Sequence, residues 1–177
     1  LGALPARFRR ARLLIVGCGD VGQRVLRHVH MGPGAGRMQV LALTSSADKA
    51  AALRAKGAVP LVGNLDDIKT LRRLSGLATR VLHLAPPPGE GAGGPSWWRD
   101  PRTVALARVM RLRSLPVSLV YASTSGVYGD CEGALVSETR AVAPATPRAQ
   151  RRVNAERAVR HLGRAGVRAN CWLCRWI

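Results

Sequence analysis

Three glycines with the spacing G-x-G-x-x-G, Gly17, Gly19 and Gly22, follow the short apolar run at residues 13–16. In a dinucleotide-binding turn the first glycine permits a tight turn out of a strand, the second lets the backbone approach a pyrophosphate, and the third allows close helix–strand packing. The phosphates then lie on a helix N-terminus, where free N–H groups and the helix dipole favour an anion. The spacing predicts a phosphate-binding turn, although an ordinary strand–turn–helix can carry the same residues.

The rest of a cofactor site is expected at the ends of later strands. An acidic residue after the second strand usually binds the ribose of NAD, but Thr44 and Ser45 stand there without a carboxylate to repel a 2′-phosphate and without an adjacent arginine to bind one. The cofactor is therefore expected to be NADP or NAD, with the balance towards NADP. The predicted cofactor-binding residues are Gly17, Gly19, Asp20, Val21, Gly22, Thr44, Ser45, Asn64, Leu65, Leu84, Ala85 and Pro86.

Two parts of this set also have purely structural interpretations. Asn64 suits a helix N-cap as well as a contact with adenine. The proline run that begins at Pro86 forms either a stiff wall of the ligand crevice or a rigid turn.

Runs typical of strands and of helices alternate along the chain, which predicts a parallel sheet covered on both faces. The fold class is α/β, a doubly wound, Rossmann-like sheet in three layers (α/β/α). Residues 12–177 would form this one domain, after a basic N-terminal arm at 1–11. The strands are expected at 13–16, 38–43, 59–62, 80–84, 117–122 and 167–173, and the helices after the glycine turn and at 47–56, 66–74, 99–113 and 148–163.

The chain has 177 residues, enough for one sizeable core, and its 28 Lys plus Arg against 10 Asp plus Glu give a formal charge of +18. Such an excess raises the hypothesis of nucleic-acid binding. The bases are scattered, however, and a bias towards arginine on solvated helix faces explains them equally well. Nucleic acid is not the expected partner.

The cysteines indicate neither a disulfide framework nor a metal site. Of the four, only Cys171 and Cys174 have the spacing of metal ligands, and no further ligands are arranged near them. No run approaches the roughly 20 apolar residues of a membrane span. The N-terminus lacks the apolar core of a secretory signal, so a cytoplasmic location is expected.

The segment YASTSGVYGD, residues 121–130, follows a predicted strand downstream of the glycine turn. With that turn it resembles the extended short-chain dehydrogenase/reductase superfamily, which includes NAD-dependent epimerases and dehydratases, over residues 12 to about 168. LAPPPGEG and TSGVYGD look most like its atypical, NAD(P)-binding epimerase-like members. The resemblance implies an NAD(P) cofactor and a nucleotide-sugar or another carbonyl or hydroxyl substrate.

The resemblance also assigns catalytic positions. The superfamily's catalytic hydroxyl falls on Thr124, which would hydrogen-bond a substrate oxygen; a Ser/Thr-rich turn is the structural alternative. Its tyrosine and lysine, four residues apart, fall on Arg148 and Arg152. Arginine is an unsuitable proton donor or acceptor, so enzymatic activity is left open. Arg152 would still supply positive charge to a ribose or phosphate.

Extended members of the superfamily continue past the sixth strand into a C-terminal substrate-binding region, most of which this chain would lack. Residues 170–177 differ in character from the sequence before them. They are either a non-native tail of a truncated or frame-shifted product or the end of a real, short variant. An incomplete sheet leaves apolar edges that favour association, which gives the hypothesis of a homodimer.

Three function hypotheses follow. The first is an atypical NAD(P)-binding epimerase/dehydratase-like protein with a small-molecule substrate. The alternative is a non-enzymatic NAD(P)-binding sensor or interaction module, suggested by Arg148 and Arg152. The third is a basic nucleic-acid-binding protein.

Overall fold

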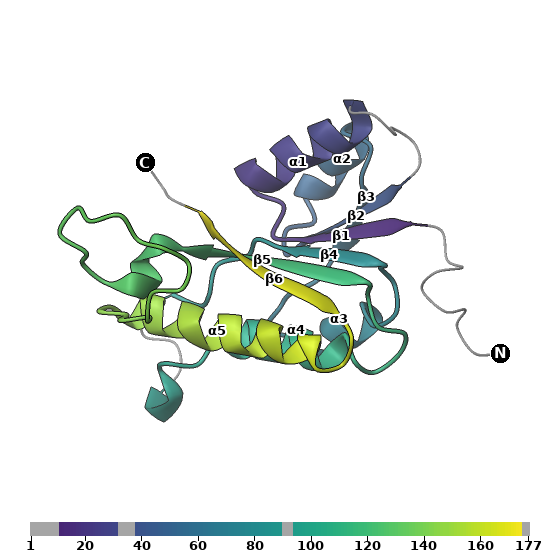
Figure 1. Cartoon of the computed structure of the whole chain (residues 1–177). Coiled ribbons are helices and arrows are strands. Elements are labelled where there is room, and N and C mark those ends of the chain that lie inside the picture. The colour runs from purple at the N-terminus through teal and green to yellow at the C-terminus, as the bar shows by residue number, and fades with distance from the viewer. Residues whose placement is uncertain (1–10, 32–37, 90–93, 175–177) are drawn as a thin grey trace.

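A computed structural model describes residues 11–31, 38–89 and 94–174. Its strands form one parallel six-stranded sheet in the order β3-β2-β1-β4-β5-β6. Helices α1 and α2 cover one face and α3, α4 and α5 the other (Figure 1). The predicted doubly wound α/β fold is confirmed. The elements are β1 Arg12–Val16, α1 Asp20–Met31, β2 Gln39–Thr44, α2 Lys49–Ala55, β3 Val59–Val62, α3 Ile68–Arg73, β4 Arg80–His83, α4 Pro101–Val109, β5 Ser118–Thr124, α5 Pro147–Gly163 and β6 Arg168–Cys174, with 3₁₀ turns η2 Gly94–Ser96 and η3 Ser125–Tyr128.

The central strand β1 contributes to two separate cores because successive side chains point to opposite faces. Leu13 and Ile15 pack with Leu26 of α1 on one face. Leu14 and Val16 belong to the larger core on the other face, which is built with α3, α4 and α5. Burial on both faces explains the continuous apolar run of this strand.

Local hydrogen bonds shift the start of α3 from the predicted position. Asp67 caps the helix, its side chain accepting from the N–H of Lys69 at 2.8 Å. The Asn64 side chain instead accepts from the N–H of Asp66 at 3.0 Å, which closes a turn before the cap. The interpretation of Asn64 as the N-cap is therefore wrong.

The stretch at 85–95, which contains the proline run, ends in the 3₁₀ turn η2, which begins at Gly94. Its residues 90–93, like residues 1–10 of the predicted arm, lie outside the described residues. The predicted tail, residues 170–177, begins inside β6. This strand pairs with β5 along its length, and the last pair in register is Thr124 with Cys174.

One face of the sheet is less covered at β5 and β6 than at β1. Ala122 and Trp172 are paired in register and lie on the face opposite α5; Ala122 is half-buried and Trp172 is 69 % exposed. Helices α1 and α2 lie over the other end of this face (Figure 1). The edge strand β6 therefore presents an aromatic side chain to solvent.

Candidate functional site

A cavity of about 280 Å³ opens at the carboxyl ends of the central strands. This edge is where parallel sheets with helices on both faces bind ligands. It brings together the glycine turn, the end of β4, the end of β5 and the first turns of α5. The lining residues are Gly17, Gly19, Asp20, Val21, Gly22, Leu84, Pro86, Ala122, Ser123, Thr124, Arg148 and Arg152.

The three glycines of the turn meet different surroundings. Gly17 has φ of +87°, and a Cβ there would lie 2.6 Å from the backbone nitrogen of Ala85. A Cβ on Gly22 would lie 3.3 Å from Cγ2 of Ile15, so helix and strand approach closely there. A Cβ on Gly19 would have nothing within 4 Å. The turn thus leaves open space only in front of its middle glycine.

A second cavity, of about 220 Å³, adjoins the first because Gly17 and Pro86 line both. Thr44 is not among its lining residues; its hydroxyl donates to the carbonyl of Ser46 at 3.2 Å. Of the predicted cofactor residues, all except Thr44 line one or both cavities. The lining of the second cavity is Gly17, Leu43, Ser45, Gly63, Asn64, Leu65, Ala85, Pro86 and Arg102.

Sequence reasoning missed Arg102, which reaches the second cavity from the first turn of α4. Its Nε and Nη2 donate to the two carboxylate oxygens of Asp66 at 2.8 and 2.6 Å. These hydrogen bonds and the guanidinium charge hold the pKa of Asp66 below its usual value. The pairing joins residues 36 positions apart, so no local sequence signal indicates it.

Two arginines stand beside Thr124 at the end of β5. Arg148 is exposed, whereas Arg152 is buried and donates from Nη1 to the carbonyl of Ala122 at 2.7 Å. In the described part of the chain, Nε of Arg152 and Oγ of Ser123 are buried without a hydrogen-bond partner. Fixed positive charge and unpaired polar atoms therefore meet at the same wall of the first cavity.

A buried chain of polar groups lies beneath this wall. The Thr103 hydroxyl donates to Asp100 at 2.6 Å and lies 2.8 Å from Nε2 of His83. Because the hydroxyl proton is already donated to Asp100, Nε2 of His83 carries the proton of the second hydrogen bond. Burial, and next the charge of Arg152, lower the pKa of His83 to about 4. Burial raises the pKa of Tyr121, whose ring lies 5.2 Å from the His83 ring. Both side chains stay uncharged near neutral pH.

Arg151 fixes the loop between β4 and α4. It is 2 % exposed, and its guanidinium donates to three backbone carbonyls: Trp97 at 2.7 Å, Pro88 at 2.9 Å and Gly89 at 2.8 Å. The same loop contains Pro86, which lines both cavities. Arg151, also missed by sequence reasoning, thus connects α5 to the wall of the site.

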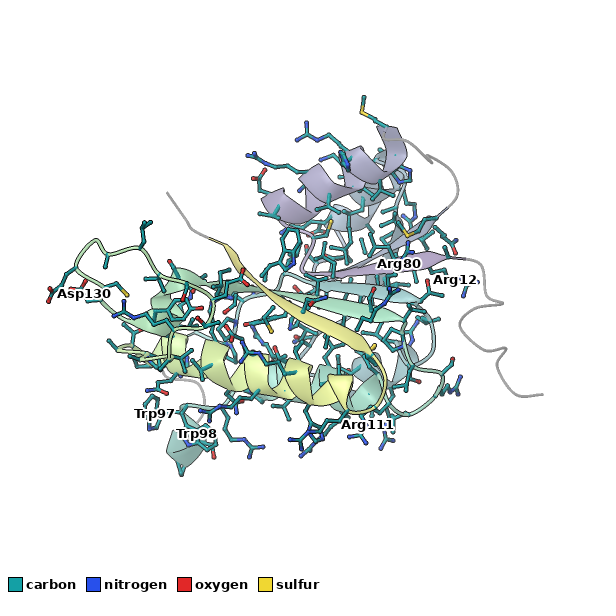
Figure 2. All side chains as sticks on the ribbon, viewed as in Figure 1. Arg12, Arg80, Trp97, Trp98, Arg111 and Asp130 are labelled. Carbon is teal, nitrogen blue, oxygen red and sulfur yellow. The ribbon has the colours of Figure 1, made fainter. Side chains whose placement is uncertain are left out.

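Basic side chains occur in several places on the described part of the chain. Arg12 and Arg80 lie where strands begin, whereas Arg111 follows α4 (Figure 2). The described residues contain no group of three or more His, Cys, Asp or Glu side chains that could hold a metal ion. Within the same residues, no helix combines the length and apolar character needed to cross a bilayer.

No family model and no curated protein matches the sequence of this chain. Solved structures do match its fold. A conserved protein of unknown function from Silicibacter pomeroyi is 27 % identical, with a TM-score of 0.62, over 84 % of this chain and 48 % of its own. A short-chain dehydrogenase/reductase superfamily protein from Agrobacterium tumefaciens, solved with bound NAD, is 21 % identical with a TM-score of 0.70, over 90 % of this chain and 47 % of its own.

The UDP-Glc/GlcNAc 4-epimerase from Campylobacter jejuni is 18 % identical with a TM-score of 0.74, over 93 % of this chain and 53 % of its own. The chain thus spans about half the length of the solved proteins that it matches. This chain therefore shares the fold of a short-chain dehydrogenase/reductase superfamily protein and of a 4-epimerase, as the resemblance predicts.

Proposed function

We propose that the chain binds NADP or NAD across the carboxyl ends of its strands, as an atypical member of the short-chain dehydrogenase/reductase superfamily. The observation that carries this proposal is the meeting of the two cavities at Gly17 and Pro86. Residues predicted from separate parts of the sequence line these two adjoining cavities, here called the crevice. The pyrophosphate would lie on the N-terminus of α1, before the open space at Gly19.

The adenosine half would occupy the second cavity, beside Ser45 and Asn64. Ser45 and Ser46 directly follow β2, so no carboxylate stands there to bind a ribose 2′-hydroxyl, and Arg102 lines the same cavity. Its pairing with Asp66 uses two of the five guanidinium N–H donors. The remaining donors and the positive charge support a preference for NADP, because they suit a 2′-phosphate.

The experiment for cofactor binding is a side-by-side calorimetric titration of the purified chain with NADPH and NADH. Gly19→Val fills the open space and is expected to raise both Kd values at least about tenfold, since pyrophosphate and side chain compete for one volume. Gly163→Val is the matched control, because a Cβ at Gly163 also has nothing within 4 Å. Absence of binding by the folded wild-type chain would refute the proposal.

The coenzyme preference has its own test. Arg102→Gln is expected to weaken NADPH binding about tenfold and to change NADH binding less than twofold, because only NADPH carries the 2′-phosphate. Arg108→Gln, on the same helix but away from this cavity, serves as the control. Equal losses for the two coenzymes would remove the preference for NADP.

For the reaction, we propose epimerase/dehydratase-like or oxidoreductase chemistry on a nucleotide-sugar or another carbonyl or hydroxyl compound. A bound nicotinamide would supply hydride transfer. Thr124 would hydrogen-bond the reacting oxygen, and Arg148 and Arg152 would supply fixed positive charge rather than a mobile proton.

A non-enzymatic NAD(P)-binding module is the second candidate. The arginines at the two positions where the superfamily has tyrosine and lysine favour it, because neither replacement carries out proton transfer near neutral pH. Cofactor binding without any substrate-dependent change in nicotinamide absorbance would support this candidate. Turnover of any carbonyl or sugar substrate would exclude it.

A further inference from the structure

Beside the proposed cofactor crevice, a separate cavity of about 430 Å³ opens at the end of β5. It is lined by Thr124, Ser125, Gly126 and Arg148, and none of these residues belongs to the glycine turn. Thr124 and Arg148 also line the crevice, so the two spaces adjoin. A ligand here would contact a bound cofactor without occupying the cofactor's place.

The charged groups around this junction are predominantly cationic. Arg148 and Arg152 are four residues apart, on one side of α5. Three acids near this junction have partners of their own: Asp20 accepts from Arg24 at 2.9 Å, Asp100 from Thr103 at 2.6 Å, and Oε2 of Glu156 from Arg160 at 2.8 Å. Oε1 of Glu156 is buried without a partner among the described residues. Two guanidinium groups thus share one wall, where like charges repel in the absence of an anion.

Buried, unpaired polar atoms lie at the same wall. Arg152 is 5 % exposed and Ser123 is fully buried, and Nε of the first and Oγ of the second lack hydrogen-bond partners among the described residues. Leaving such polar groups unsatisfied in the interior costs free energy. Both residues line the crevice.

The cofactor's own pyrophosphate does not account for this charge. It would lie at the turn after β1, whereas the arginines lie at the end of β5, and β4 separates the two strands. Two strand spacings amount to roughly 10 Å. Arg148 and Arg152 therefore lie at the opposite side of the crevice from the proposed position of the pyrophosphate.

We propose that Arg148 and Arg152, with Thr124 and Ser125, bind a carboxylate or phosphate group of the substrate beside the cofactor. This inference rests on the proposed function for the cofactor's position and adds the chemical class of the second ligand. Carboxylate and phosphate share the paired anionic oxygens that a guanidinium binds in a bidentate manner.

The test is calorimetric titration of the full chain with oxalate and, separately, with inorganic phosphate, at an ionic strength held constant with sodium chloride. Saturable binding of at least one probe is expected. Arg148→Ala should raise its Kd at least about tenfold because a charge-assisted contact is lost, and Arg148→Lys should recover part of the affinity. Arg157→Ala, an exposed arginine of α5 outside both cavities, should leave the Kd unchanged.

No saturable binding of either probe, or equal Kd values in the Arg148→Ala and Arg157→Ala proteins, would overturn the inference. Competition between NADPH and the probe would assign the arginines to cofactor phosphates and would also overturn it. Probe binding that depends on Arg148, in a chain that binds neither NADPH nor NADH, would refute the proposed function and leave the anion site standing.

Discussion

Gly17 and Gly19 have different physical reasons to be glycine. At Gly17 a positive φ and the backbone of Ala85 exclude any side chain, so the residue is required by the fold itself. At Gly19 a Cβ would meet nothing within 4 Å, so the fold itself does not exclude a side chain. Stability and binding can therefore be separated by substitutions two residues apart.

We expect Gly17→Ala to lower the free energy of unfolding by roughly 1–3 kcal/mol, the range for a residue held in unfavourable backbone geometry. Its Cβ would lie 2.6 Å from the nitrogen of Ala85, so β1 and the end of β4 must separate. Urea denaturation measures the loss. Gly19→Ala is the control and should stay within about 0.5 kcal/mol of the wild type; equal losses at the two positions would contradict this account.

His83 predicts a specific loss of stability in acid. Its pKa is about 4 in the folded chain, against 6.5 for a histidine in water, so the unfolded chain binds the proton first as pH falls. The contribution of His83 to the free energy of unfolding is complete above pH 6.5 and decreases by about 3 kcal/mol as the pH falls to 4. Asp100 opposes this trend, because burial raises the pKa of its carboxyl in the folded chain.

The measurement is the pH dependence of the free energy of unfolding in the wild type and in His83→Gln. The variant removes the titrating group and should show a shallower fall between pH 6.5 and 4. Parallel profiles in the two proteins would contradict burial of a neutral His83.

At the level of elements, the N-terminus of α4 is held more strongly than that of α3. Asp100 is 1 % exposed, accepts from the N–H groups of Arg102 and Thr103, and donates its own N–H to Asn154 of α5 at 2.9 Å. Asp67 caps α3 at an exposed position. Both helices are thus capped by an aspartate, but only the cap of α4 is buried and hydrogen-bonded to another helix.

We expect Asp100→Ala to cost about 2–3 kcal/mol, because it removes a cap and also leaves the buried Thr103 hydroxyl without its acceptor. Asp67→Ala, the matched substitution on α3, should cost about 1 kcal/mol. Urea denaturation of both variants gives the comparison. A larger loss at Asp67 would contradict the role assigned to the buried chain of polar groups.

Elements were predictable wherever local sequence determines them. The apolar run of β1 and the glycine turn gave the first strand and helix, because burial and turn geometry are encoded within a few residues. Arg102 and Arg151 were not predictable as parts of the site. Their partners lie 36 and 54–63 residues away, and only the folded sheet brings them together.

At the scale of the whole molecule, the exposed end of the sheet predicts self-association. Trp172 is 69 % exposed on the edge strand β6, where unpaired backbone and an aromatic side chain both favour contact with another chain. We expect Trp172→Ser to reduce concentration-dependent association in sedimentation equilibrium while leaving Tm within about 2 °C of the wild type, as for surface substitutions.

Trp97→Ser is the control for that experiment, since Trp97 is 46 % exposed in the loop before α4 (Figure 2). Its backbone carbonyl, the acceptor for Arg151, is retained in the variant. Equal effects of the two substitutions, or a wild-type chain that stays monomeric at all concentrations, would argue against an interface at β6.

The anchoring of one loop by Arg151 also sets an order of events during synthesis. The backbone of Pro88 and Gly89 leaves the ribosome more than 60 residues before the guanidinium that fixes it. A nascent chain that ends before α5 therefore has its glycine turn but lacks both the anchored loop and the wall formed by Arg148 and Arg152. The complete crevice belongs only to a chain in which α5 has docked, so nucleotide binding would report that folding has passed this point.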